Sequence, residues 1–293
     1  MNDNVIEFIT YKNALKGNYR KGVHTMRCIL ENPAQAADFA ASVGAVSVVF
    51  GVPVDKPDRN SDELLELVLN SFVCDKATLT FLSQFYPENA ESYDTMMNSA
   101  ERCAEIFATP ILWRPVGRSN CLTAKLIVTL AGLNCVEYGD LAAVVSSSVA
   151  MEAVAASQTA MTAVAASQTA MTAVAASATA RGAVTASSTA LAALEQSPLI
   201  SEVSASSFNG TSYTTVYTGL CFIVAARRSS GSNTFIFNNT YTGSSTTTGA
   251  SSAKTIGATN SAINLFATGV VVKLESSNSP SSNAIYFRII KCG

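Results

Sequence analysis

A ten-residue repeat constrains the fold of this chain more than any other feature of its sequence. From Ala150 to Thr189 the sequence reads AMEAVAASQT, AMTAVAASQT, AMTAVAASAT and ARGAVTASST, and decayed units stand on either side. Ala is the strongest helix former, and Met and Gln also favour helices. Between positions 140 and 197 there is no proline, and Gly182 is the only glycine. The repeat is therefore predicted to be helical.

The spacing of the large apolar residues predicts how such a helix packs. They recur in steps of three and seven, so each unit equals one heptad plus three residues, a pattern that overwinds a coiled coil. Because the segment has little charge and many small side chains, we expect an α-helical coiled-coil stalk, most simply of three strands. The residues expected in its oligomerisation seam are Met151, Val154, Met161, Val164, Met171, Val174, Val184, Leu191 and Leu194.

Two other structures are compatible with this repeat. A segment rich in Ala, Ser and Thr can be a flexible linker. Ten-residue coils can also stack as a β-solenoid, although strands are usually depleted in Ala. A transmembrane helix is excluded, because Ser, Thr or Gln recurs in every unit and interrupts any long apolar run.

Charge and composition change twice along the chain. Residues 1–140 carry 12 Lys+Arg and 17 Asp+Glu, residues 141–200 one basic and two acidic residues, and residues 201–293 six basic and two acidic residues. We therefore expect a multidomain α + β protein. Its parts are a mostly helical attachment domain at 1–139, the helical stalk at 140–198 and a β-rich tip at 199–293. No part is basic enough to indicate nucleic acid as a partner.

Several local signals in the first domain predict its elements. Asn32-Pro33 is a typical helix start, and apolar residues between Pro87 and Phe107 fall on one helical stripe. The run from Ala45 to Phe50 predicts a short buried strand, and prolines on either side of residues 111–114 predict an extended segment. Residues 122–133 are apolar enough for a core helix.

The last domain alternates short apolar runs with Ser, Thr, Asn and Gly. Strands spaced at 8–12 residues predict a β-sandwich or jelly-roll-like domain, closed within one chain or by strands shared in a trimer. The predicted strands are Tyr213–Tyr217, Leu220–Ala226, Thr234–Phe237, Thr240–Thr242, Lys254–Ile256, Ile263–Phe266, Gly269–Leu274 and Ala284–Ile290.

Residues typical of catalysis do not form a recognisable pattern. His24 is the only histidine, and with Cys28 it forms a sequence-local pair that we interpret as ordinary side chains rather than a nucleophile and its base. The seven cysteines are widely spaced, which does not match a zinc site. Only Glu202 and Glu275 are acidic in the tip, so two glycosidase carboxylates would need a subunit interface. We expect no enzyme, no cofactor and no metal.

The tip has residue types suited to binding. Arg227 and Arg228 end an apolar run and precede a Ser/Gly loop, and Tyr241 is one of several aromatic residues beside them. Aromatic rings, arginines and hydroxyls together predict a receptor site for a sugar or an anionic surface polymer. The alternative is that these rings fill the core, since alternate residues of a strand face inward.

The sequences AMTAVAASQTAMTAVAASQTAM in the repeat and YFRIIKCG at the end carry a resemblance. They resemble the decapeptide arrays and terminal tip strands of fibre-type virion proteins of tailed bacteriophages. The resemblance covers about half the chain. It implies a homotrimeric structural fibre in the virion, docked to other virion proteins through 1–139 and binding a host-surface glycan or protein through 199–293.

The beginning of the sequence, MNDNVIEF, does not have the pattern of a signal peptide, so we expect assembly in the host cytoplasm without membrane insertion. Two alternatives to a receptor-binding fibre remain open. One is a purely structural decoration or neck protein, and the other is a glycan-cleaving tip.

Overall fold

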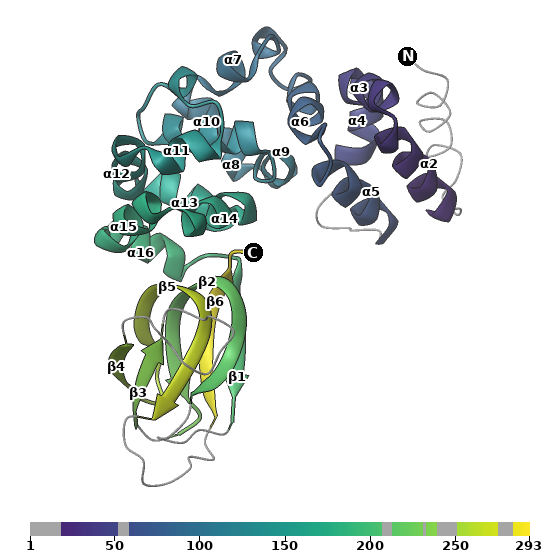
Figure 1. Ribbon diagram of the computed structural model, residues 1–293. Coiled ribbons are helices and arrows are strands. Elements are labelled where there is room, and N and C mark those ends of the chain that lie inside the picture. Colours follow the sequence, from purple (N-terminus) through teal and green to yellow (C-terminus); the bar gives the residue numbers. More distant parts are fainter. Residues whose placement is uncertain (1–18, 52–58, 207–212, 231–232, 239–250, 275–283) are drawn as a thin grey trace. The chain divides into compact units, whose positions relative to one another are not determined.

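A computed structural model describes residues 19–51, 59–206, 213–230, 233–238, 251–274 and 284–293 of the 293-residue chain. The fold is mixed α/β, with helices as far as Glu195 and strands from Ile200 onward (Figure 1). The chain divides into two compact units, Met1–Val144 and Val145–Gly293. The helices of the repeat and the strands that follow them therefore belong to one unit.

Short helices build the first unit. Four of these helices pack on the helix three positions later in the chain: α2 on α5, α3 on α6, α6 on α9 and α7 on α10. The helices are α2 (Tyr19–Glu31), α3 (Pro33–Ala41), α4 (Val43–Phe50), α5 (Arg59–Leu69), α6 (Cys74–Leu82), α7 (Tyr93–Met97), α8 (Ala100–Ala108), α9 (Pro110–Val116) and α10 (Asn120–Leu130), with 3-10 turns η1 (Pro87–Asn89) and η2 (Cys135–Glu137). Helix α11 (Leu141–Ser146) spans the boundary between the units.

Capping residues set the ends of these helices. The helix start at Asn32 is confirmed, because its side chain accepts hydrogen bonds from the amides of Ala34 and Gln35. The predicted single stripe from Pro87 to Phe107 is wrong. Ser92 and Ser99 each cap a new helix there, so the segment forms η1, α7 and α8.

Two segments predicted to be extended are helices. The run from Ala45 to Phe50 lies in α4, which Ser42 caps, and its β-branched residues pack at helical spacing. Residues 111–115 lie in α9, where Pro110 occupies the first helical position and loses no intrahelical hydrogen bond. Trp113 of this helix packs edge-on against Phe107, with ring centroids 4.9 Å apart. The predicted core helix at 122–133 is confirmed as far as Leu130, where α10 ends.

The repeat folds into a separate short helix for every unit. The helices are α12 (Ser148–Ala156), α13 (Gln158–Ala166), α14 (Gln168–Ala176), α15 (Ala178–Ala186) and α16 (Ser188–Glu195). The residue between two helices is always serine, and it has extended backbone angles, as in Ser157 with φ −90° and ψ 114°. Its hydroxyl oxygen accepts a hydrogen bond from the third amide of the next helix, as from Ala160 at 3.3 Å.

The predicted coiled-coil stalk is therefore wrong. An extended residue cannot continue an α-helix, and α12 and α13 meet at an angle of 100°. Serine is favoured at this N-cap position because its hydroxyl accepts a hydrogen bond from a backbone amide that the helix itself leaves unpaired.

The ten-residue repeats stack on one another within a single chain. Helix α12 packs on α15 and α13 on α16, so about three units complete one turn of a helical solenoid. Three of the serine hydroxyls also donate to carbonyls on the preceding turn of this stack: Ser177 to Val145 at 2.6 Å, Ser187 to Ala155 at 2.5 Å and Ser197 to Ala165 at 2.5 Å.

The residues predicted for the seam lie inside one chain. Eight of the nine predicted seam residues are buried by the stacked repeats: Met151, Val154, Met161, Val164, Met171, Val174, Val184 and Leu194. Leu191 is half-buried. Burial within the chain explains the apolar period without a second copy.

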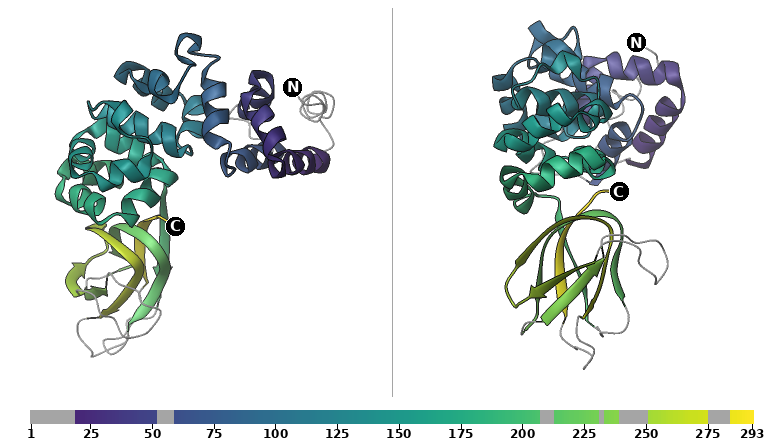
Figure 2. Two further views of the ribbon diagram at one scale, coloured as in Figure 1. Left: turned by 45° about the horizontal axis from the view of Figure 1, so that its top comes forward. Right: turned by 60° about the vertical axis from the view of Figure 1, so that its left-hand side comes forward.

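Among the described residues after the solenoid there are six antiparallel strands: β1 (Ile200–Ala205), β2 (Thr214–Arg228), β3 (Asn233–Asn238), β4 (Ser251–Ile256), β5 (Ser261–Leu274) and β6 (Ile285–Lys291). They form one sheet in the order β1-β6-β2-β5-β3-β4, in place of the two sheets of the predicted sandwich. The sheet curls until the amide of Arg228 on β2 donates to the carbonyl of Gly257 after β4, at 2.8 Å. Figure 2 shows this curl from two further directions.

Both faces of the sheet bury apolar residues. The inner face holds a cluster that includes Ile223, Val272 and Phe287. On the other face Phe222 packs against Phe266, with ring centroids 4.7 Å apart, and pairs with Ile290. Helix α14 contacts β2 in the same unit, and the Gln168 side chain donates to the carbonyl of Lys291 at 2.6 Å.

The strands differ from the predicted ones mainly in length. Strand β2 unites two predicted strands across Gly219, which has φ +125° and lies against the ring of Tyr217. A Cβ there would lie 3.0 Å from the tyrosine hydroxyl. Strand β5 likewise unites two predicted strands, β1 was not predicted, and the predicted strand at 240–242 lies outside the described residues.

Candidate binding surface

The outward face of β1, β6 and β2 carries a group of charged and aromatic side chains. In the sheet register Glu202 pairs with Arg288, and Arg227 pairs with Tyr286. Neighbouring residues Ile285, Phe287 and Ile289 are buried on the inner face. Since successive strand residues alternate between faces, Glu202, Arg227, Tyr286 and Arg288 lie together on the outer one. We call these four residues the Arg227 patch.

Arg227 is held on two sides within the patch. Its guanidinium carbon lies 4.2 Å from the centroid of the Tyr286 ring. Its Nη2 donates to Glu202, at 3.1 Å from Oε2 and 3.4 Å from Oε1. The side chains of Arg227 and Glu202 remain 36% and 44% exposed, so solvent screens this ion pair. The contacts orient the guanidinium more than they stabilise the fold.

Arg288 connects the patch to the solenoid of the same unit. It lies on β6 between Glu202 of β1 and Ala225 of β2. Its Nη2 donates to the carbonyl of Glu195 at the end of α16, at 3.3 Å. A second cation is thus fixed beside Arg227 on the same face.

Two more tyrosines of this unit carry cations over their rings. Lys273 lies 4.9 Å from the centroid of Tyr213, and Lys291 lies 5.6 Å from that of Tyr217. Burial raises the pKa of Tyr217 above its ordinary value. A cation held over an aromatic ring is attracted by the negative face of the ring, so each of these contacts orients a lysine side chain.

The structure separates the three residues predicted for a receptor site. Arg227 lies in the patch, whereas Arg228 pairs with Ile285 on the inner face and is only 4% exposed. Tyr241 lies outside the described residues. Sequence reasoning missed Glu202 and Arg288 as site residues. The alternation of 286 and 288 on one strand was visible, but its pairing with β1 and β2 was not.

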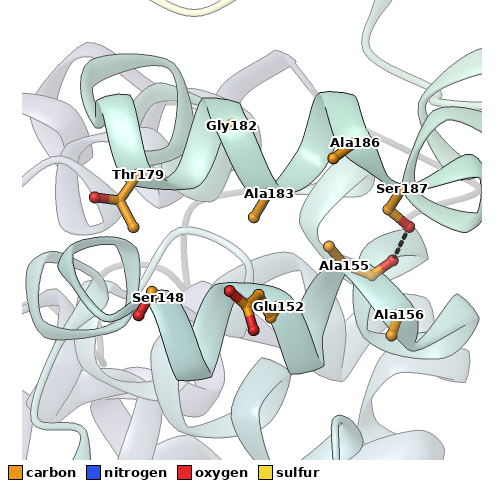
Figure 3. A pocket seen from close by; sticks show the side chains of 9 residues that line it. All are labelled: Ser148, Glu152, Ala155, Ala156, Thr179, Gly182, Ala183, Ala186 and Ser187. Carbon is orange, nitrogen blue, oxygen red and sulfur yellow. Dashed lines mark hydrogen bonds between the residues drawn. The ribbon is translucent and has the colours of Figure 1, made fainter.

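A shallow groove runs between α12 and α15 of the solenoid (Figure 3). It encloses about 450 Å³ and is lined by Ser148, Glu152, Ala155, Ala156, Thr179, Gly182, Ala183, Ala186 and Ser187. Glu152 is the only charged residue among them. A glycosidase needs two carboxylates, so this groove does not supply that chemistry.

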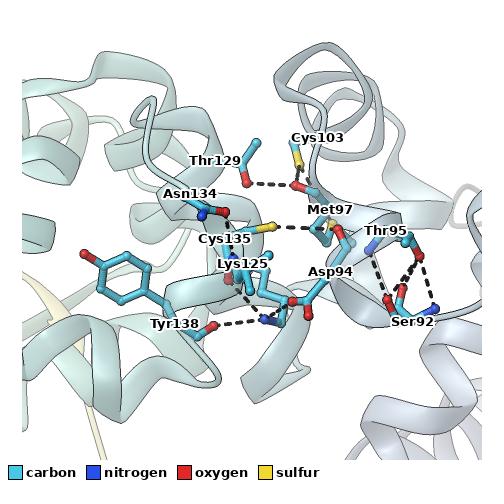
Figure 4. A network of polar contacts seen from close by, with 11 residues as sticks. Ser92, Asp94, Thr95, Met97, Cys103, Lys125, Thr129, Asn134, Cys135 and Tyr138 are labelled. Carbon is cyan, nitrogen blue, oxygen red and sulfur yellow. Dashed lines mark hydrogen bonds and ion pairs between the residues drawn. The ribbon is translucent and has the colours of Figure 1, made fainter.

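A buried lysine in the first unit holds the surrounding helices together. The Lys125 side chain is 6% exposed and forms an ion pair with Asp94. Its Nζ also donates to the carbonyls of Cys135 and Tyr138, each at 3.1 Å (Figure 4). These contacts satisfy the three donors of an ammonium group, so Lys125 serves the fold.

The remaining reactive side chains do not assemble into a site. His24 Nε2 lies 3.8 Å from Cys28 Sγ on the exposed side of α2. Burial raises the pKa of Cys103, Cys221 and Cys292 to about 12 each, which keeps these thiols protonated. Within the described residues no three His, Cys, Asp or Glu side chains lie close enough to hold a metal ion.

Comparison with known proteins gives no relative: no protein-family model matches the chain, and no curated protein matches its sequence. In the part of the chain that the structure describes, no single helix is long and apolar enough to span a membrane.

Proposed function

We propose that this chain is a structural protein of a bacteriophage virion that presents the Arg227 patch to a glycan on the host surface. The observation that carries the proposal is the outward cluster of Arg227, Tyr286, Glu202 and Arg288 on β1, β6 and β2. The resemblance of the decapeptide array to phage fibre-type proteins supports the virion setting. The role is binding, and no catalytic step is part of it.

The solenoid acts as the spacer in this proposal. Its interior is filled by Met, Val and Ala side chains of the repeat, and its helices are fixed by the serine bonds between turns. Stacking of this kind produces a rigid element whose length follows the number of units. Docking to other virion proteins is assigned to the first unit.

An oligomer, and a trimer in particular, remains a prediction for the full chain. Because the proposed seam residues are buried within one chain, a trimer would have to form through other surfaces. Light scattering distinguishes a mass of three chains from the 30.6 kDa of one.

Two measurements test the proposed function. Antibodies against the chain should label phage particles in immunogold electron microscopy, and fluorescent full-length chain should bind bacterial cell envelopes. A purely structural decoration or neck protein would label particles without binding envelopes, which would refute the receptor role. An enzyme would release soluble saccharide from the envelopes.

A further inference from the structure

Three tyrosines among the described residues of the second unit each have a cation over one ring face. Tyr286 lies under Arg227, Tyr213 under Lys273 and Tyr217 under Lys291. A ring face that already bears a cation is closed to an uncharged sugar. What these pairs offer to a ligand is an oriented positive charge.

The net charge of the Arg227 patch also favours a negatively charged ligand. Arg227 and Arg288 stand against one carboxylate, Glu202. Residues 201–293 as a whole carry six basic and two acidic residues. Charge complementarity favours an anionic partner for such a surface.

We infer that the Arg227 patch binds an anionic group on a glycan, a carboxylate or a phosphate, which replaces Glu202 as the partner of Arg227. This inference rests on the proposed function and names the chemical class of its ligand. A guanidinium presents five N–H donors in a planar fork that matches both groups, and the ion pair with Glu202 uses Nη2. The Glu202 side chain is 44% exposed, so water can hydrate its carboxylate after the ligand has displaced it from Arg227.

Tyr286 prepares Arg227 for this exchange. The contact, 4.2 Å from the guanidinium carbon to the ring centroid, keeps the guanidinium over the ring while its other partner changes. Ordering a long side chain before binding lowers the entropy cost of association. Tyr286 is therefore a positioning residue, and Arg227 is the residue that touches the ligand.

The experiment measures binding of the full chain to three polysaccharides by isothermal titration calorimetry. Polygalacturonate offers carboxylates, a phosphorylated mannan offers phosphates, and dextran is neutral. We expect binding to one or both anionic polymers, weakened by salt, and none to dextran. The stronger of the two anionic polymers identifies the charged group that the patch prefers.

Paired variants then test the exchange with Glu202. Arg227→Gln should weaken binding about tenfold, since it removes a charged hydrogen-bond donor. Glu202→Gln should strengthen binding several-fold, because it removes the internal competitor. Tyr286→Phe keeps the ring and should bind as the original chain does, whereas Tyr286→Leu should weaken binding.

Lys76→Gln is the matched control for net charge. Lys76 is an exposed residue of α6 in the first unit, so its loss should leave the affinity unchanged. Equal binding to dextran, or weaker binding in both Arg227→Gln and Glu202→Gln, would overturn the inference. If the chain binds envelopes but neither anionic polymer, the proposed function stands and the inference fails. If it binds no envelope at all, the receptor role itself fails.

Discussion

A single hydroxyl has two structural roles at each junction of the solenoid. Ser187 accepts a hydrogen bond from the amide of Ala190 at 3.2 Å, which caps α16. The same hydroxyl donates to the carbonyl of Ala155 at 2.5 Å, on the preceding turn of the solenoid. Hydroxyl groups can do both because they are donors and acceptors at once. Serine at this position therefore determines the helix end and the stacking together.

Replacing this serine should destabilise the chain measurably. Ser187→Ala removes the cap and leaves a carbonyl without its donor, so we expect a loss of about 1–3 kcal/mol in the free energy of unfolding. Urea denaturation followed by circular dichroism gives this value. Ser188→Ala, at the exposed neighbouring position, should change it by less than about 0.5 kcal/mol. Equal effects of the two variants would contradict the role given to Ser187.

The buried lysine of the first unit gives a second prediction at this scale. Lys125→Met keeps most of the side-chain volume but leaves Asp94 and the carbonyls of Cys135 and Tyr138 without their cation. We expect a loss of about 2–3 kcal/mol, moderated because Asp94 is 42% exposed. Thermal unfolding of the full chain measures it. Lys76→Met, on an exposed site, should leave the melting temperature unchanged.

At the scale of elements, the sequence predicted helix in the repeat but not its ends. Serine costs a long helix little by intrinsic propensity, so the Ala-rich composition alone favours an uninterrupted helix. The missed signal is the recurrence of a capping residue at every tenth position. The same spacing occurs in the first unit, where Asn32 and Ser42 cap α3 and α4. Ser99 and Ser119, which cap α8 and α10, are twice that distance apart, and Thr109 stands midway at the start of α9.

The sheet shows a different limit of prediction. Seven of the eight predicted strand segments coincide, to within one residue, with parts of β2, β3, β4, β5 or β6, because alternation and turn residues are local signals. The order β1-β6-β2-β5-β3-β4 depends on pairing between segments far apart in the chain, and local patterns do not encode that register. The Arg227 patch depends on this order, so no motif search could have assembled it.

The ten-residue period itself can be tested by insertion. Gln158–Ser167 and Gln168–Ser177 have identical sequences, so an additional copy placed after Ser177 presents the same buried residues to its neighbours. We expect that variant to gain helical circular dichroism and keep its melting temperature within about 5 °C. A five-residue insertion at the same place shifts every later serine out of register and should lower the melting temperature clearly. A continuous helix would tolerate both insertions alike.

At the scale of the whole molecule, buried thiols link stability to alkaline pH. Cys103, Cys221 and Cys292 have pKa values raised by burial from 9.0 to about 12. Unfolded thiols lose their protons near pH 9 and folded ones near pH 12, so the folded state is favoured fully below pH 9 and progressively less above it. Compared with pH 7, ionisation of each thiol in the unfolded chain should lower the free energy of unfolding by about 1 kcal/mol at pH 10. Denaturation between pH 7 and 10.5 measures this slope, and Cys221→Ala should make it shallower.

The division into two units predicts which fragments fold. The sheet buries Phe222, Phe266 and Ile290 on the face opposite its own core. Helix α14 contacts β2, and Gln168 and Arg288 add hydrogen bonds between the solenoid and the strands.

A fragment of residues 145–293 keeps these contacts and should unfold in one cooperative step. A fragment of residues 199–293 removes the helices and should expose the three apolar side chains, so we expect it to melt at lower temperature and to bind the dye ANS. Calorimetry and ANS fluorescence of the two fragments provide the comparison. If the shorter fragment is as stable as the longer one and binds no dye, the repeat helices do not cover the sheet.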